Sequence, residues 1–138
     1  MFQLKLAEMA ARCTAENQAL AKRFLTDEVA PLVAAISDNT FVCDPNAREI
    51  IAKRYLSYPS ERPEDWLARV AARLALVEIE HGRGSEKERY DAARALFEPL
   101  YRLMLDRRFL PAGRTLANAD HYIVPNWCVF SFFPFLRS

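Results

Sequence analysis

Apolar residues recur at intervals of three or four along most of this chain, which is the spacing that places them on one face of an α-helix. The first such stripe runs through residues 2–36, and it is interrupted near residues 14–17 or bent at Pro31. We therefore expect one long helix or two consecutive helices before residue 37. The stripe consists of Phe2, Leu6, Met9, Ala10, Cys13, Leu20, Phe24, Leu25, Val29, Leu32, Val33 and Ile36.

A second helix is predicted after the polar connection at residues 37–41. Asp44 followed by Pro45 supplies a capping side chain and a first-turn residue whose φ is already helical. The helix should extend to about Leu56, with Ile50, Ile51 and Tyr55 on its inward face.

A third helix is predicted to begin at Pro63, where Glu64 and Asp65 face the positive end of the helix dipole. It should end at His81, followed by Gly82 in a left-handed cap and a short link to Gly84. Its buried side is predicted to consist of Trp66, Val70, Leu74 and Val77.

Ser85 and Glu88 form a capping box, which predicts the start of a fourth helix with a kink at Pro99. Its inward residues are expected to be Tyr90, Ala93, Phe97, Leu100 and Met104. The basic residues near its end, Arg102, Arg107 and Arg108, are favoured there by the helix dipole.

The helical pattern ends at residues 111–113, and the last ten residues have the composition of a β-strand. A strand without a partner leaves backbone donors and acceptors open, and nearby phenylalanines add apolar surface. We therefore expect self-association of the isolated chain. The phenylalanines are Phe130, Phe132, Phe133 and Phe135.

Composition narrows the class of protein. The chain has 138 residues, of which 51% are hydrophobic and 27% charged, so we expect a globular protein. Because its net charge is only +1, we expect it to bind neither nucleic acid nor a membrane. No secretory signal and no membrane-spanning run are recognised. Three widely spaced cysteines argue against a disulfide framework and for a cytoplasmic protein, in which Cys13 and Cys43 are structural. The spacing of His81 and His121 does not predict a zinc site.

Three segments resemble the large chain of ribonucleotide reductase, most closely its adenosylcobalamin-dependent (class II) branch. They are REIIAKRYL at residues 48–56, PEDWLARVAARLA at residues 63–75 and RRFLPAGRTLANA at residues 107–119, of which the third is the most specific. The resemblance implies a mainly α fold, in which a helical N-terminal domain leads into the first strand of an incomplete α/β barrel. Residues 1–38 would then be a helical extension, residues 39–108 the reductase helical domain, and residues 109–138 the truncated start of the catalytic barrel.

The resemblance also implies roles for three residues near the C-terminal end. Cys128 matches the first of two cysteines that supply electrons, Thr115 a hydroxyl that contacts the substrate, and Asn126 a small polar residue beside the cysteine. Trp127 separates Asn126 from Cys128 where the family commonly has the two adjacent. Arg114 and Thr115 could together bind a phosphate or ribose oxygen; equally, Thr115 could cap a turn while Arg114 lies in solvent.

The resemblance implies an N-terminal fragment of a vitamin B12-dependent ribonucleotide reductase, which we expect to be inactive alone. Its partners would be the ribonucleotide substrate and the remaining barrel segment, and adenosylcobalamin would bind the intact relative rather than this chain. The alternative is a stand-alone helical module that binds a partner protein through its aromatic tail.

Overall fold

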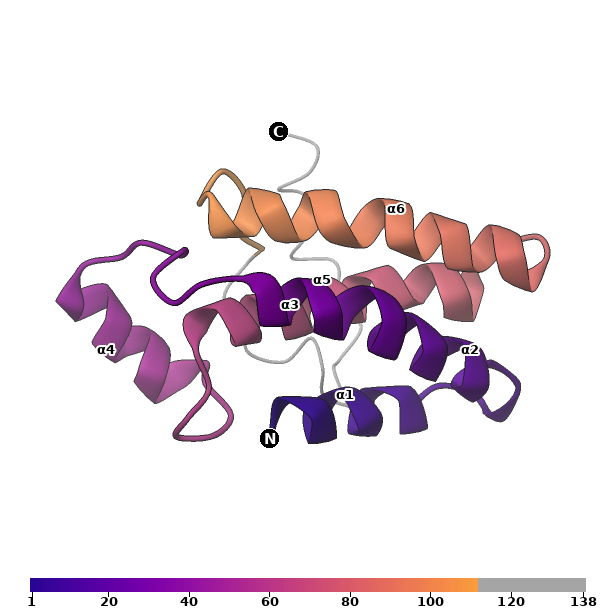
Figure 1. Cartoon of the computed structure of the whole chain (residues 1–138), viewed down its shortest axis with the longest axis horizontal. Coiled ribbons are helices and arrows are strands. Elements are labelled where there is room, and N and C mark those ends of the chain that lie inside the picture. Colours follow the sequence, from indigo (N-terminus) through magenta and orange to yellow (C-terminus); the bar gives the residue numbers. More distant parts are fainter. Residues whose placement is uncertain (112–138) are drawn as a thin grey trace.

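The computed structural model describes residues 1–111, and these residues form α-helices joined by turns, with no strand among them (Figure 1). The mainly helical fold expected from the sequence is therefore confirmed for this part of the chain. The strand expected in the last ten residues lies outside the described residues. The helices are α1 (Phe2–Ala11), α2 (Gln18–Phe24), α3 (Ala30–Ala35), α4 (Pro45–Arg54), α5 (Pro63–His81) and α6 (Glu86–Leu105).

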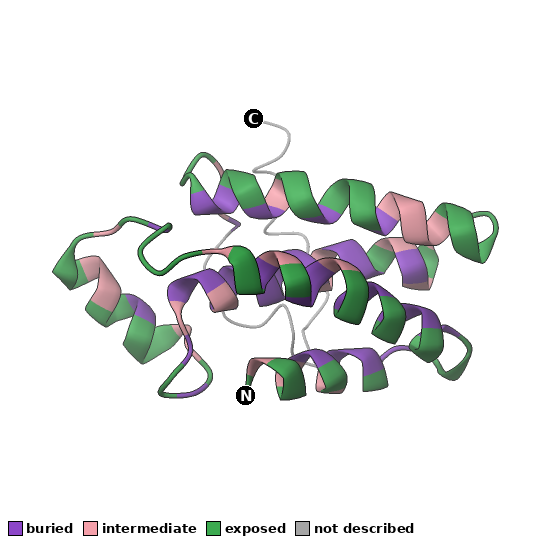
Figure 2. Cartoon of the chain, viewed as in Figure 1, coloured by how far each residue is buried: buried purple, intermediate pink, exposed green. Residues whose placement is uncertain are grey.

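The long helices α5 and α6 form an antiparallel hairpin that is the centre of the fold (Figure 1). The N-terminal helices α1, α2 and α3 pack across this hairpin, whereas α4 lies apart at one end. Buried residues lie on the sides of the helices that face one another, and the outward sides of α4 and α6 are largely exposed (Figure 2). One apolar core thus joins the N-terminal helices to α5 and α6.

The N-terminal stripe is interrupted at the predicted position and carries a second irregularity. Residues 12–14 separate α1 from the 3₁₀ turn η1 (Ala15–Asn17), which leads directly into α2. A π-helical turn, η2 (Leu25–Val29), then joins α2 to α3. It lies just before Pro31, which has no N–H to donate and whose ring crowds the preceding turn.

Helix α4 begins as predicted but buries fewer of its apolar residues. The Asp44 carboxylate accepts a hydrogen bond from the Ala47 N–H at 2.8 Å, and Pro45 is the first helical residue. Ile51 is buried, but the prediction that Ile50 faces inward is wrong, because 52% of Ile50 is exposed. The helix lies at the edge of the bundle, and Ile51 is its buried residue.

Helix α5 has the predicted bounds, but its buried surface differs from the predicted stripe. Trp66 and Val70 are buried and Leu74 is half-buried, whereas Val77 is 44% exposed and does not belong to the buried side. In the second half of α5 the buried face consists instead of residues 72, 75, 76 and 79. Small side chains on this helix let neighbouring helices approach closely. The fully buried alanines are Ala68, Ala71, Ala72 and Ala75.

The turn between α5 and α6 uses its glycines differently from the prediction. Gly82 has a φ of −68° and is not left-handed, whereas Gly84 has a φ of +100°. Gly82 is nevertheless favoured by space, since a Cβ atom there would lie 2.1 Å from the Glu78 carbonyl oxygen. The capping box of Ser85 and Glu88 is confirmed, and it starts α6.

Helix α6 continues through Pro99 to Leu105 and contributes the aromatic centre of the core. Phe97 stacks on Tyr101 with a centroid separation of 5.6 Å, and both rings are buried. The predicted inward stripe is confirmed, with Ala93, Phe97 and Met104 fully buried and the remaining two members half-buried.

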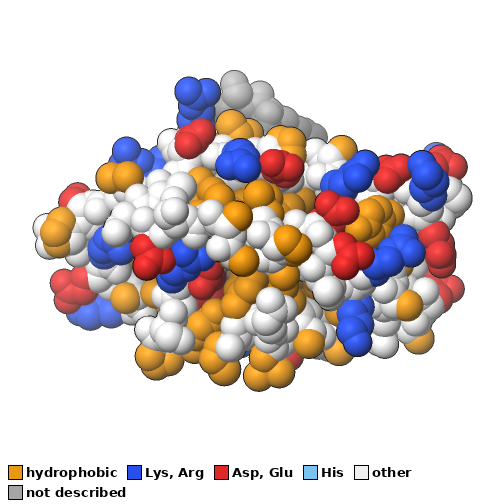
Figure 3. All heavy atoms as spheres, in the orientation of Figure 1, with side chains coloured by type: hydrophobic (Ala, Val, Ile, Leu, Met, Phe, Trp, Pro, Cys, Tyr) orange, Lys and Arg blue, Asp and Glu red, His pale blue; other side chains and the backbone are white. Residues whose placement is uncertain are grey.

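The surface of the bundle carries acidic, basic and apolar side chains. On the face shown in Figure 3, acidic and basic side chains are interspersed, so no large region of one charge sign forms there. Apolar side chains lie between them. Across residues 1–111, the large hydrophobic residues exposed are Met1, Leu4, Val42, Ile50, Val77, Leu96 and Leu103. Within this same range no helix has the length and apolar character needed to cross a membrane.

Candidate functional site

The four residues for which the sequence predicts a chemical role lie outside the described part of the chain. Arg114, Thr115, Asn126 and Cys128 all follow residue 111. The structure describes the segment that precedes them in sequence, which is the end of α6 with residues 106–111, and a set of polar contacts around the start of α5. These two regions together are the candidate functional site.

The chain reverses direction at the end of α6 through a left-handed residue. Arg107 has a φ of +58°, and its N–H donates to the Met104 carbonyl at 3.0 Å. The Arg108 N–H donates to the Leu103 carbonyl at 3.0 Å. This is the Schellman arrangement, in which the two backbone bonds satisfy carbonyls at the helix end, with arginine in the position that glycine usually occupies.

Residues 109–138, which the resemblance assigns to the start of the catalytic barrel, are called the ribbon below, and the first three of them lie against the helical core. Phe109 and Leu110 are half-buried and pack on the core cluster, and Pro111 is buried. The basic residues just before them, Arg102, Arg107 and Arg108, are all exposed. The described chain therefore returns to the bundle immediately after the turn, which fixes where the ribbon starts relative to α5 and α6.

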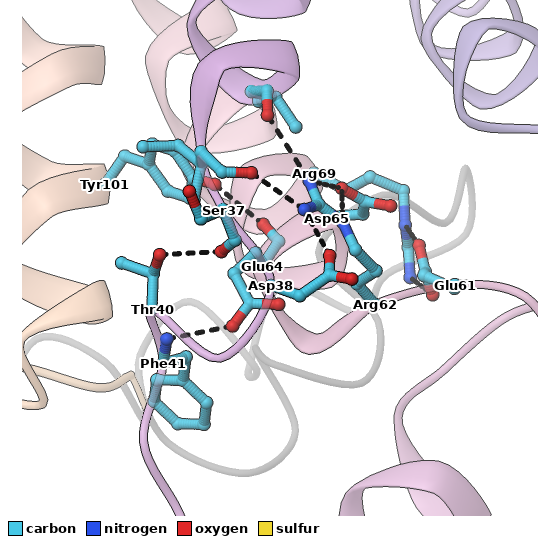
Figure 4. A network of polar contacts seen from close by, with 12 residues as sticks. Ser37, Asp38, Thr40, Phe41, Glu61, Arg62, Glu64, Asp65, Arg69 and Tyr101 are labelled. Atoms are coloured by element: carbon cyan, nitrogen blue, oxygen red, sulfur yellow. Dashed lines mark hydrogen bonds and ion pairs between the residues drawn. The ribbon is translucent and has the colours of Figure 1, made fainter.

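A buried ion pair lies beside the first turns of α5 (Figure 4). The Arg69 guanidinium contacts both oxygens of the Glu61 carboxylate, at 2.6 and 2.9 Å, and Glu61 also accepts the Ser57 N–H at 2.8 Å. Both charged side chains are almost fully buried, with exposures of 2% and 0%. Such a pair is tolerated in an interior only when hydrogen bonds offset the loss of water.

Glu64 and Tyr101 extend these contacts to the neighbouring loop and to α6. The Glu64 carboxylate accepts the Phe41 N–H at 2.8 Å, while the Tyr101 hydroxyl donates to the Glu64 backbone carbonyl at 2.9 Å (Figure 4). Burial raises the pKa of Tyr101, so its hydroxyl stays protonated and able to donate. The start of α5, the loop before α4 and the end of α6 are therefore held together.

Arg62 joins the same region to the C-terminal end of α3. Its guanidinium donates to the Ile36 carbonyl at 2.8 Å and to the Val33 carbonyl at 3.3 Å. It also pairs with Asp65 and Asp38, each at 2.8 Å. The hydrogen bond to Asp65 is the main cause that raises the pKa of Arg62, which therefore remains a permanent cation.

These groups can position the backbone, but they do not form a reaction centre. Throughout residues 1–111 every buried side-chain nitrogen and oxygen has a hydrogen-bond partner, and no group of three potential metal ligands is present there. Burial raises the pKa of Cys13 to about 11, so its thiol is not ionised near neutral pH. We therefore assign the polar contacts around α5 a supporting role.

Reasoning from the sequence missed these contacts. Glu64 and Asp65 were expected only to face the helix dipole, and no role was predicted for Glu61 or Arg69. The one signal available was a set of charged residues next to Trp66 in a segment otherwise suited to a core.

Comparison with known proteins identifies a family. Residues 41–121 match the family described as ribonucleotide reductase, all-alpha domain. The match contains Arg114 and Thr115, whereas Asn126 and Cys128 lie beyond it. No curated protein and no solved structure matches the chain. Because the family match covers more than half of the sequence, the chain belongs to the ribonucleotide reductase family and contains its all-alpha domain.

Proposed function

We propose that this chain is the N-terminal portion of an adenosylcobalamin-dependent ribonucleotide reductase, comprising the helical domain and the start of the catalytic barrel. The family match over residues 41–121 supports the reductase part of this proposal, and the resemblance of the three segments quoted above is what favours the adenosylcobalamin-dependent branch. The matched range includes Thr115, which the resemblance matches to a hydroxyl that contacts the substrate, and the neighbouring Arg114. We also propose that the protein is cytoplasmic.

The described geometry gives the helical domain a role in such an enzyme. Phe109, Leu110 and Pro111 pack on the core, while Tyr101 ties the last part of α6 to the start of α5. Because residues 109–111 pack on the core, the start of the ribbon has a fixed position relative to α5 and α6. Such a fixed start matters because catalytic groups must be held to within about 0.5 Å of their working geometry. The helical domain would thus set the position from which Thr115 and Cys128 approach the substrate.

The proposed overall reaction replaces the 2′-hydroxyl of a ribonucleotide with hydrogen and releases the hydroxyl as water. Two thiols supply the two electrons and become a disulfide, and we propose Cys128 as one of these thiols. Thr115 and Arg114 would bind the ribose or a phosphate, and Asn126 would lie near the thiol. In the intact enzyme, adenosylcobalamin would be the source of the radical chemistry that the resemblance implies.

The described residues do not fit a cobalamin site. His81 lies exposed at the end of α5, and the buried polar groups of residues 1–111 are already paired with one another. We therefore expect cobalamin to require the rest of the barrel, and we expect no nucleotide reduction by this chain alone. Turnover by the purified chain with nucleotide, cobalamin and a dithiol would overturn this assignment.

The genomic context provides the first test. DNA immediately downstream should be translated in all three frames and searched for the remaining barrel sequence with its cysteines. Its presence would support the reductase assignment. Unrelated sequence there would favour the stand-alone interaction module.

A reconstituted enzyme provides the second test. With the remaining barrel segment supplied, changing Cys128→Ser should abolish turnover with a dithiol reductant, because the variant cannot form the disulfide. Cys43→Ser is the matched control, since Cys43 lies just before α4 and should not be required. Full activity in Cys128→Ser would show that another residue supplies the electrons.

A further inference from the structure

The helices that precede the family match make specific contacts with the matched helices. The match begins at Phe41, so α1, α2 and α3 all lie before it. Nevertheless α1 packs on α5, and α2 packs on both α5 and α6. Specific contacts fix the position of α1–α3 relative to α5 and α6.

An aromatic contact forms the middle of this interface. Phe24 of α2 is completely buried and meets two rings of α6 edge-on, Tyr90 at 6.0 Å and Phe97 at 6.1 Å between centroids. Arg23 lies over the Tyr90 ring at 4.8 Å, and the Tyr90 hydroxyl donates to Glu28 at 2.9 Å. Edge-to-face geometry of this kind depends on a defined relative position of the two helices.

Polar contacts fix one end of the interface. The Thr14 N–H and hydroxyl both donate to Glu80 of α5, at 3.1 and 3.2 Å. Arg89 of α6 donates to the buried side chain of Asn17 at 2.9 Å and to the Ile79 carbonyl at 2.7 Å. Residues before the match thus satisfy polar groups inside it.

Arg62 fixes the other end. It donates to the last carbonyl groups of α3 and pairs with Asp38, as described above. Because such contacts occur at both ends and in the middle, α1–α3 cannot slide along α5 and α6 without breaking several of them. The packing is therefore fitted rather than loose.

We propose that the surface of α5 and α6 covered by α1–α3 is an interaction surface whose partner is the chain's own residues 1–36, and that the two parts unfold as one cooperative unit. The segment before the family match then completes the core of the matched domain. This inference does not depend on the cobalamin chemistry, because it concerns contacts among residues 1–111 only.

Native-state hydrogen exchange of the full chain tests the proposal. Changing Phe24→Ala removes a fully buried ring and should lower the protection of amides by roughly 100-fold or more. The prediction is that central amides of α6, around Phe97, lose protection by the same factor as those of α2. Leu4→Ala is the control, because Leu4 lies on the exposed side of α1 and its truncation should change protection by only a few-fold.

Unequal loss of protection in α2 and α6 would contradict the proposal. If α2 loses protection while α6 keeps its wild-type value, the N-terminal helices are a separable attachment and the proposal is wrong. Should Phe24→Ala abolish the whole fold, the shared unfolding will have been observed directly. The smaller change Phe24→Leu then measures the same two regions in a folded chain.

Discussion

The buried ion pair beside α5 allows a quantitative test of how this domain is held together. The change is Arg69→Met, which keeps most of the length of the arginine side chain but removes its charge. Glu61 is then left inside the protein, where it still accepts the Ser57 N–H but has lost the Arg69 guanidinium. The domain should be strongly destabilised, because an uncompensated buried charge is costly.

The burial of the pair sets the size of the effect. With side-chain exposures of 2% and 0%, water cannot replace the lost partner unless the structure opens. Removing one member of such a pair costs about 3–5 kcal/mol, against a typical domain stability of about 5–15 kcal/mol. The midpoint of thermal unfolding should fall by about 10–20 °C. The double variant Glu61→Gln/Arg69→Met keeps an acceptor for Ser57 without the charge and should recover about half of the loss or more.

Urea unfolding followed by circular dichroism at 222 nm measures these differences in the free energy of unfolding. The comparison requires that the slope of this free energy against urea concentration be the same in the variants as in wild type. Lys53→Met is the control, because it breaks the Lys53–Glu49 pair of 2.9 Å whose side chains are 72% and 64% exposed. That change should stay within about 0.5 kcal/mol of wild type. A loss below about 1 kcal/mol for Arg69→Met, or no recovery in the double variant, would refute the reasoning.

Three further predictions follow from single residues. Arg107→Gly should raise the free energy of unfolding by about 0.5–1 kcal/mol, because glycine adopts the positive φ of that turn without steric cost; a lower urea midpoint would contradict this. Burial raises the pKa of Tyr58 from its usual value near 10 to about 12, so its contribution to stability is complete below pH 10 and is lost as the pH rises to 12. Tyr58→Phe should therefore show a smaller fall in urea midpoint over that interval than wild type, and an identical fall would count against the assignment. Cys13, buried and with its pKa raised to about 11, should react with iodoacetamide at pH 8 far more slowly in the folded chain than in urea, as measured by mass spectrometry of its peptide; equal rates would show that the thiol is accessible.

The ends of the helices could be predicted from the sequence because they depend on neighbouring residues. Asp44 caps α4, Pro63 starts α5, and Ser85 with Glu88 starts α6, and each signal lies within four residues of the boundary it determines. The buried faces were harder to predict. The spacing of large apolar residues predicts that Val77 lies on the buried side of α5, because small residues contribute little to such a pattern. In the structure the second half of α5 instead buries a different face, which includes Ala72 and Ala75.

The candidate site could be predicted only in part, because its contacts join residues that are distant in sequence. Arg62 reaches carbonyls 26 and 29 positions earlier, and the Tyr101 hydroxyl reaches a carbonyl 37 positions earlier. No local pattern encodes such partners. The roles of Thr115 and Cys128 came from family resemblance, and they remain predictions because both residues follow the described part of the chain.

The π-helical turn at Leu25–Val29 has a consequence for how the N-terminal helices tolerate insertions and deletions. The π turn closes over five residues where an α-helical turn closes over four, so deleting one residue from it would restore α-helical winding and leave α2 and α3 nearly in phase. An α-helix advances about 100° per residue, so deleting one residue inside α2 would instead rotate the preceding turns of α2 by about 100° relative to α3. After that rotation the faces of α2 and α3 that are buried together, which include Phe24 and Val33, could not both meet the core. We therefore expect a one-residue deletion to be better tolerated in the π turn than in α2.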